Sequence, residues 1–118
     1  MHQGSILVVE DDHDTRVSLR YLLEEEGYTV LTATDGSSAL ELLRSAHPKP
    51  CVILLDLMLP VMNGWSFAER VKQRPELKQI PIVIMSAFQD PPPPTGVAGF
   101  CKKPLDLNTL LKMVEQYC

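Results

Sequence analysis

Apolar residues occur along this chain in two patterns, as short unbroken runs and at helical spacing. Five short runs predict strands, at residues 5–9 (SILVV), 28–33 (YTVLTA), 51–55 (CVILL), 80–86 (IPIVIMS) and 97–101 (VAGFC). The first, third and fourth runs are apolar nearly throughout. This is typical of strands in a parallel sheet that is covered on both faces.

Segments with helical spacing separate these runs. Apolar residues recur at intervals of three and four within residues 17–23, 39–43, 67–71 and 107–114. The alternation of strands and helices with short joints predicts an α/β fold, a doubly wound five-stranded parallel sheet made of right-handed βαβ units. Five strands fit the flavodoxin-like order 2-1-3-4-5.

The connection at residues 87–96 (AFQDPPPPTG) breaks this alternation. The four consecutive prolines at 91–94 remove four backbone donors and fix φ, so an ordinary helix cannot form there. We therefore expect the fourth helix of such a fold to be missing or reduced, with a stiff polyproline II crossover in its place. A PxxP ligand for a partner protein is the less favoured interpretation.

Composition limits the classes of partner. The 118 residues carry 11 basic and 15 acidic side chains, a net charge of −4, which argues against a nucleic-acid surface. No apolar run reaches the roughly 18 residues of a membrane span.

The three cysteines form an odd set without metal-ligand spacing. Cys51 and Cys101 lie in apolar runs, so we expect both to be small core residues of a protein in the reducing cytosol. We expect one cytoplasmic domain over residues 1–118, with no output domain after it.

Carboxylates gather where the predicted strands end. Glu10 and Asp11 follow the first strand, and Asp56 follows the third. In the 2-1-3-4-5 order these two strands are neighbours, and ligands bind at their carboxyl ends. Two carboxylates about 5 Å apart repel each other by roughly 3 kcal/mol at an effective dielectric constant near 20, so the group needs a cation. Oxygen ligands with room for water and a phosphate favour Mg²⁺.

A hydroxyl and an ammonium group arrive at the same edge. Ser86 ends the fourth predicted strand, and Lys103 follows the fifth. With a cation, these groups can hold an oxyanion, and a carboxylate among them can act as a nucleophile that carries a phosphoryl group. Each residue also has a structural interpretation, because a serine can cap a strand end and a lysine can be solvated. Asp12 and Asp14 are assigned to helix capping.

Four segments together resemble the response-regulator receiver domain of two-component signalling. They are residues 6–12 (ILVVEDD), 54–64 (LLDLMLPVMNG), 85–87 (MSA) and 103–104 (KP). The resemblance runs from about residue 5 to the last residue. It implies that Asp56 is the phospho-acceptor and that Glu10 and Asp11 are the acidic pair that binds Mg²⁺, with Asp11 the more direct ligand.

The same resemblance implies further roles. The backbone carbonyl of Met58 would bind Mg²⁺, and Ser86 and Lys103 would contact the phosphoryl oxygens. Phe100 would be the aromatic side chain whose rotamer reports the phosphorylated state, with Ser86 as its switch partner. The Lys103–Pro104 peptide bond is expected to be cis.

The function implied by the resemblance is phospho-acceptance from a sensor histidine kinase or phosphotransfer protein, followed by a conformational signal to a downstream protein. Such a module is not an enzyme, although it promotes its own phosphorylation and dephosphorylation. The alternative is a phosphorylation-independent interaction module on the same fold, which the missing helix motivates. A flavodoxin-type flavin protein and a haloacid-type phosphatase fit less well, because the first strand ends in acidic residues and Met58 stands where the phosphatase has a second acid. No nucleic acid or membrane partner is expected, and the oligomeric state stays open, a homodimer included.

Overall fold

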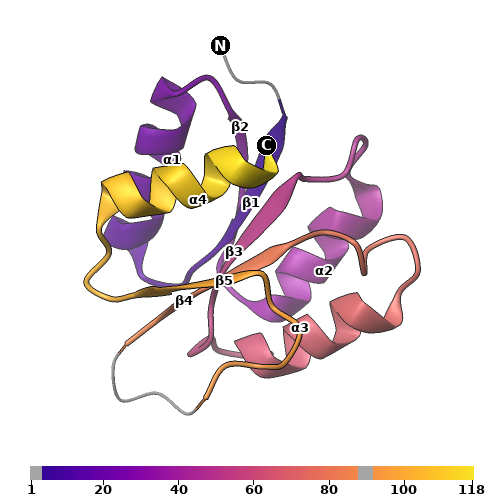
Figure 1. The fold of residues 1–118 in the computed structure, drawn as a ribbon. Helices are drawn as coiled ribbons and strands as arrows, with labels where there is room; N and C mark the ends of the chain where they lie inside the picture. The colour runs from indigo at the N-terminus through magenta and orange to yellow at the C-terminus, as the bar shows by residue number, and fades with distance from the viewer. Residues whose placement is uncertain (1–3, 88–91) are drawn as a thin grey trace.

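Five parallel strands form the centre of the molecule, in the order β2-β1-β3-β4-β5 (Figure 1). The structure, a computed structural model, describes residues 4–87 and 92–118. Its strands are β1 (Ser5–Val9), β2 (Thr29–Ala33), β3 (Val52–Asp56), β4 (Ile82–Ser86) and β5 (Gly99–Lys102). The predicted sheet and its strand order are confirmed, with the bounds of the first strand unchanged and those of the others shifted by at most two residues.

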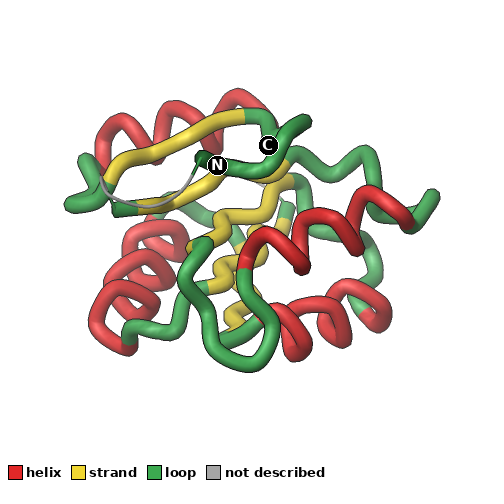
Figure 2. The backbone as a smooth tube through the Cα atoms, turned by 90° about the horizontal axis from the view of Figure 1, so that it is seen from below, coloured by secondary structure: helices red, strands yellow, loops and turns green. Residues whose placement is uncertain are grey.

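Helices cover both faces of this sheet (Figure 2). They are α1 (His13–Glu25), α2 (Gly36–Ser45), α3 (Gly64–Gln73) and α4 (Leu107–Tyr117). Alternate residues of each strand enter different cores, because successive side chains of a strand point to opposite faces. Leu7 and Val9 pack with α2 and α3, whereas Ile6 and Val8 pack with α1 and α4. This two-sided burial explains the nearly continuous apolar runs.

Each helix begins at a polar residue whose side chain accepts a backbone N–H of the first turn. These N-cap residues are Asp12, Asp35, Asn63 and Asp106. The capping role expected for Asp12 is confirmed, and Asp14 lies in the first turn of α1. A cap of this kind contributes about 1 kcal/mol. The caps fix where each helix starts relative to the strand before it, and so they fix the loops at one edge of the sheet.

The connection from β4 to β5 confirms the expected loss of a helix. Its described residues, 87 and 92–98, contain no helix. Residues 88–91, which include the first proline of the run, lie outside the described residues, and the polyproline II conformation stays a prediction. The returning segment passes beside α3 (Figure 1), where the Trp65 indole N–H donates to the Pro92 carbonyl at 2.9 Å. Trp65 therefore binds the crossover in addition to packing on the core.

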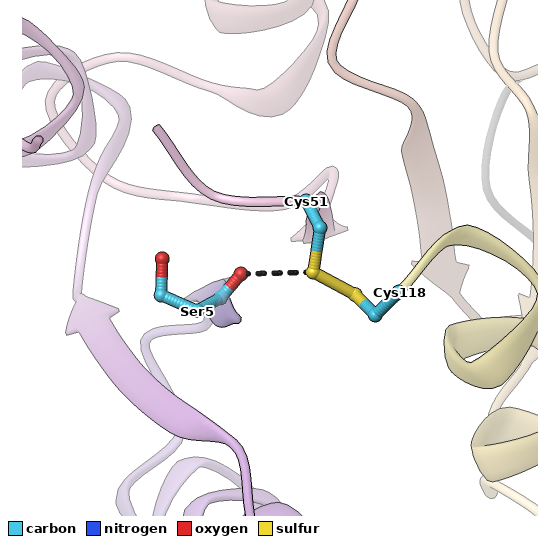
Figure 3. Close-up of a disulfide and its surroundings, with 3 residues drawn as sticks. All are labelled: Ser5, Cys51 and Cys118. Atoms are coloured by element: carbon cyan, nitrogen blue, oxygen red, sulfur yellow. Dashed lines mark hydrogen bonds between the residues drawn. A yellow bond between two sulfur atoms is a disulfide. The ribbon is translucent and has the colours of Figure 1, made fainter. Parts of the chain in front are cut away.

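The cysteine prediction was wrong for Cys51. Cys51 and Cys118 form a disulfide, with their Cα atoms 5.5 Å apart (Figure 3). The two residues are 67 positions apart in sequence, and only the packing of α4 on the sheet brings the end of that helix to the start of β3. Cys101 is a free, buried cysteine, as expected. None of the described helices is long and apolar enough to cross a membrane.

Candidate functional site

The register of β1 and β3 places three acidic residues at one edge of the sheet. Val9 pairs with Leu55, so Glu10 and Asp56 follow at the same level on neighbouring strands. The backbone N–H of Glu10 donates to Ala33 of β2 at 3.0 Å, which extends the ladder by one residue. The predicted meeting of the first and third strand ends is confirmed.

The three carboxylates form a compact group. One oxygen from each of Glu10, Asp11 and Asp56 lies within 4.8 Å of the others. Glu10 is fully buried and Asp56 is 5 % exposed, whereas Asp11 is exposed to solvent. The group is therefore buried on the side of the sheet and open on the side of Asp11.

Lys103 contacts this group from the far side of β4. Its Nζ lies 2.6 Å from Glu10 Oε1 and 3.5 Å from Asp56 Oδ2. The second Glu10 oxygen, Oε2, accepts the backbone N–H of Asp12 at 3.1 Å. The Lys103–Pro104 bond is cis, as the resemblance implied. The backbone N–H of Lys103 donates to Ser86 at 2.8 Å, which continues the ladder between β4 and β5 beyond the last residue of β5.

Burial and like charge make the Asp56 carboxylate hard to ionise. Burial raises the pKa of Asp56 to about 6, and the Glu10 charge adds to the rise, while Lys103 opposes it. For Lys103, burial acts to lower the pKa, but the hydrogen bond that its ammonium group donates to Glu10 and the Asp56 charge outweigh burial and raise the pKa. A single ammonium group does not balance three carboxylates. The oxygen-only donors, the excess of negative charge and the open side at Asp11 fit a small hard cation such as Mg²⁺.

Ser86 lies close to Asp56 through strand register. Asp56 pairs with Met85, so Ser86 lies one residue beyond Asp56 on the adjacent strand. Its side chain is buried, and its hydroxyl donates to the Ala87 carbonyl at 3.3 Å. The hydroxyl is thus at the predicted edge of the sheet.

The side chains of Phe100 and Met58 lie outside the acidic group. Phe100 is on β5, two strands away from β3, and is 45 % exposed. The Met58 backbone N–H donates to Asp56 Oδ1 at 3.2 Å, and its side chain is exposed. Metal binding by the Met58 carbonyl and switching by Phe100 stay predictions.

Two further residues shape this edge and were not singled out in the sequence. The Arg16 guanidinium donates from Nη1 to the carbonyls of Glu10 and Asp11, at 3.1 and 3.2 Å. Gly64 packs under the loop after β3, where an added Cβ would lie 2.7 Å from the Asp56 carbonyl oxygen and 2.6 Å from Leu57 Cα. An arginine on a helix surface has no sequence signal for such a contact, because the contact depends on where α1 starts.

Known proteins resemble the chain over nearly its whole length. It is 35 % identical over 121 residues to an uncharacterized 14.6 kDa protein of Leptolyngbya boryana, a match covering 98 % of this chain and 91 % of that protein. It is 41 % identical over 88 residues to the sensor histidine kinase TmoS of Ectopseudomonas mendocina, covering 75 % of this chain but only 9 % of TmoS. Chemotaxis protein CheY4 of Vibrio cholerae has the same fold, with a TM-score of 0.86, 29 % identity and coverage of 99 % and 100 % of the two chains.

A family model describes what these relatives share. The model of the response regulator receiver domain matches residues 6–115, a range that includes the acidic group, Ser86 and Lys103. The strand order β2-β1-β3-β4-β5 brings these residues to one edge of the sheet. In sheets of this order, ligands bind at that edge, beyond the carboxyl ends of the strands. By sequence and by architecture, this chain belongs to the response regulator receiver domain family.

Proposed function

We propose that this receiver domain accepts a phosphoryl group on Asp56 from the phosphohistidine of a sensor histidine kinase or phosphotransfer protein. One observation carries the proposal: a nearly buried carboxylate lies beside an ammonium group, 3.5 Å away, and within 4.8 Å of two further carboxylates. This arrangement combines a nucleophile, a fixed positive charge and oxygen ligands at one strand end. The match to part of a sensor histidine kinase supports a kinase as the phosphoryl source.

The reaction is a group transfer onto the protein itself. An Asp56 carboxylate oxygen attacks phosphorus, the P–N bond to the donor imidazole breaks, and the imidazole leaves with that electron pair and takes up a proton from water. The product on this chain is an acyl phosphate. The chain therefore acts as a phospho-acceptor and not as an enzyme with a separate substrate.

The residues around Asp56 have distinct tasks in this transfer. Lys103, held between Glu10 and Asp56, offers its ammonium group to the incoming phosphoryl oxygens, and the Ser86 hydroxyl is one residue further along the neighbouring strand. Mg²⁺ bound by Glu10, Asp11 and Asp56, with the Met58 carbonyl, would neutralise charge on the phosphoryl oxygens. Arg16 fixes the loop that carries Glu10 and Asp11 by binding both of their carbonyls.

The output is a shift between conformations. A phosphoryl group on Asp56 gives Lys103 and Ser86 new partners. Ser86 ends β4 and Lys103 follows β5, and the two are joined by a backbone hydrogen bond. A change at these residues can therefore reach β5, which includes Phe100. The crossover after β4 lacks a helix in its described part, so the signal would reach a downstream protein through a surface made by residues 92–98 and α3. Such a role places the protein in the cytoplasm, where kinases draw on ATP.

A second candidate function is binding of a partner without phosphorylation. The observation that favours it is the crossover held to α3 by the Trp65–Pro92 hydrogen bond, in place of a helix that could move. The complete acidic group with Lys103 counts against it, since a purely structural module does not need three carboxylates at one strand end.

The test is reaction with a small phosphodonor such as acetyl phosphate and Mg²⁺, followed by intact-mass measurement. The wild-type chain should gain the mass of one phosphoryl group, and the gain should be absent in Asp56→Asn and after chelation of Mg²⁺. Asp35→Asn is the matched control, because Asn also caps a helix and Asp35 lies at the start of α2, outside the acidic group. No gain in the wild-type chain would favour the second candidate.

A further inference from the structure

A pair of cysteines joins two elements at the end of the sheet opposite Asp56. Cys51 directly precedes β3, whereas Asp56 is the last residue of the same strand. Cys118 directly follows α4, and the Cα atoms of the two cysteines are 5.5 Å apart (Figure 3). A separation in this range allows a disulfide without movement of the backbone. The bond joins the end of the last helix to the beginning of the central strand.

Cys51 has a defined partner in either redox state. Its backbone N–H donates to the Ser5 carbonyl at 2.9 Å, so the residue is fixed to β1 independently of the disulfide. Its Sγ lies 3.2 Å from the same carbonyl oxygen (Figure 3). A disulfide sulfur carries no proton and cannot donate there, but a thiol can. When the bond is reduced, the Cys51 thiol therefore has an acceptor in place and does not need to move.

Cys118 is anchored differently. Its backbone N–H donates to the Val114 carbonyl at 3.0 Å, within the last turn of α4. In that turn, the Tyr117 hydroxyl donates to the Ala98 carbonyl at 3.3 Å, and Ala98 belongs to the crossover after the proline run. The terminal turn of a helix frays readily unless it is held. Reduction would thus loosen the end of α4 and its contact with the crossover, while Cys51 stays in position.

We propose that Cys51 and Cys118 form a reversible dithiol–disulfide pair that fixes the C-terminal turn of α4 to the start of β3 when oxidised and releases it when reduced. The inference concerns the end of the sheet opposite Asp56 and does not rest on the proposed phosphoryl transfer. Both cysteines are partly exposed, so small thiols and disulfides can reach them. Cys101 is buried with its Sγ 3.2 Å from Met113 Sδ, and burial raises the pKa of its thiol. Cys101 is therefore protected from exchange.

The oxidant in this proposal is a low-molecular-weight disulfide such as oxidised glutathione. One cysteine thiolate attacks a glutathione sulfur, which forms a mixed disulfide and releases one glutathione thiolate. The second cysteine thiolate then attacks the protein sulfur of the mixed disulfide and releases the second glutathione. The two protein thiols lose two electrons, the glutathione disulfide gains them, and the two protons end on the released thiols. In reduction by a dithiol, one thiolate of the reductant attacks the protein disulfide and releases one cysteine, and its second thiolate then releases the other cysteine and closes an internal disulfide in the reductant.

The first test compares the 118-residue chain after equilibration with oxidised glutathione and after treatment with dithiothreitol. Alkylation followed by non-reducing peptide mapping should show a Cys51–Cys118 cross-link in the oxidised sample and two alkylated cysteines in the reduced one. Reduction should lower the melting temperature on the order of 10 °C, because a cross-link over 67 positions constrains the unfolded chain strongly. Cross-links at Cys101, or alkylation of both Cys51 and Cys118 after oxidation, would overturn the proposal.

Variants separate the pair from a general effect of dithiothreitol. Cys118→Ser should melt at the temperature of the reduced wild-type chain and should not respond to dithiothreitol, whereas Cys101→Ser should keep the full response. Amide exchange at residues 114–118 should be faster in the reduced chain by at least an order of magnitude. Equal exchange in the two redox states would contradict release of the helix end. Phosphorylation by acetyl phosphate should be the same in both states, so failure of phosphorylation would overturn only the proposed function.

Discussion

Lys103 and Glu10 are 93 positions apart in the sequence, yet the lysine Nζ lies 2.6 Å from the Glu10 carboxylate. Glu10 is fully buried, and the Lys103 side chain is 25 % exposed. The pair links the residue after β1 to the residue after β5 across the edge of the sheet. It holds the ammonium group where it also reaches Asp56, at 3.5 Å.

Removing the lysine should therefore destabilise the fold. We expect Lys103→Met to lower the free energy of unfolding by about 2–3 kcal/mol at pH 7, because the Glu10 charge would remain buried without its partner. Urea unfolding measures this change, with Lys112→Met on the exposed side of α4 as the control. The double variant Glu10→Gln, Lys103→Met should recover part of the loss. Equal stability of Lys103→Met and Lys112→Met would contradict the importance of the pair.

Asp56 should make stability depend on pH. Its folded pKa, about 6, is above its ordinary value of 3.8, so the folded state holds the proton more tightly. This contribution favours folding below pH 3.8 and is lost as the pH rises through 6. With chelator present, we expect Asp56→Asn to be more stable than wild type by about 1–2 kcal/mol at pH 8, after allowance for solvent screening, and to show no difference near pH 4.

Urea unfolding of both chains over that pH range is the measurement for Asp56. Asp35→Asn serves as the control, since Asp35 is a partly exposed helix cap. A stability difference between Asp56→Asn and wild type that stays constant from pH 4 to pH 8 would show that the pKa of Asp56 is the same in the folded and unfolded states, and it would contradict the raised pKa.

Magnesium should stabilise the chain through Asp11. A ligand that binds only the folded state raises the melting temperature with its concentration. We expect such a rise with MgCl₂ in wild type and a much smaller one in Asp11→Asn, because Asp11 is the exposed carboxylate of the group. Asp14→Asn is the matched control, being an exposed aspartate in the first turn of α1. Scans at constant ionic strength exclude simple screening, and an identical rise in Asp11→Asn would contradict the site.

Gly64 should resist substitution although it lies in a helix. Replacing a helical glycine by alanine ordinarily stabilises a protein by about 1 kcal/mol. Here the new Cβ would lie 2.7 Å from the Asp56 carbonyl oxygen, so we expect Gly64→Ala to destabilise the fold by about 2 kcal/mol and to slow phosphorylation. Ser66→Ala, an exposed site two residues further along α3, is the control in unfolding and phosphorylation assays. A more stable Gly64→Ala chain would refute the close approach.

The crossover after β4 should respond to the state of Asp56. We expect a phosphate mimic such as beryllofluoride to change amide exchange within residues 87–101. We also expect Trp65→Phe to speed amide exchange at residues 95–98, because this substitution removes the hydrogen bond to the Pro92 carbonyl. Hydrogen exchange with mass spectrometry gives both results, and Trp65→Tyr tests whether a different polar ring restores protection. An unchanged pattern at residues 87–101 with the mimic would exclude this segment from signalling.

The sequence predicted those features that depend on periodicity and strand order. Apolar runs and helical spacing fix a two-sided parallel sheet, and its order brings Glu10, Asp11 and Asp56 to one edge. The Lys103–Glu10 pair was not predictable in this form, because the resemblance assigned Lys103 to phosphoryl oxygens and the preference for Glu10 depends on side-chain distances. The Cys51–Cys118 bond was missed for a similar reason, since it depends on where α4 ends relative to β3.

The central claim is that Asp56 is the residue that becomes phosphorylated. Acyl phosphates react with hydroxylamine to give a stable hydroxamate, so the acceptor can be marked after reaction with acetyl phosphate and Mg²⁺ and then located by peptide fragmentation. We predict one hydroxamate, at Asp56, that is absent without Mg²⁺ and absent in Asp56→Asn. A hydroxamate at another carboxylate, or none in wild type, would contradict the claim.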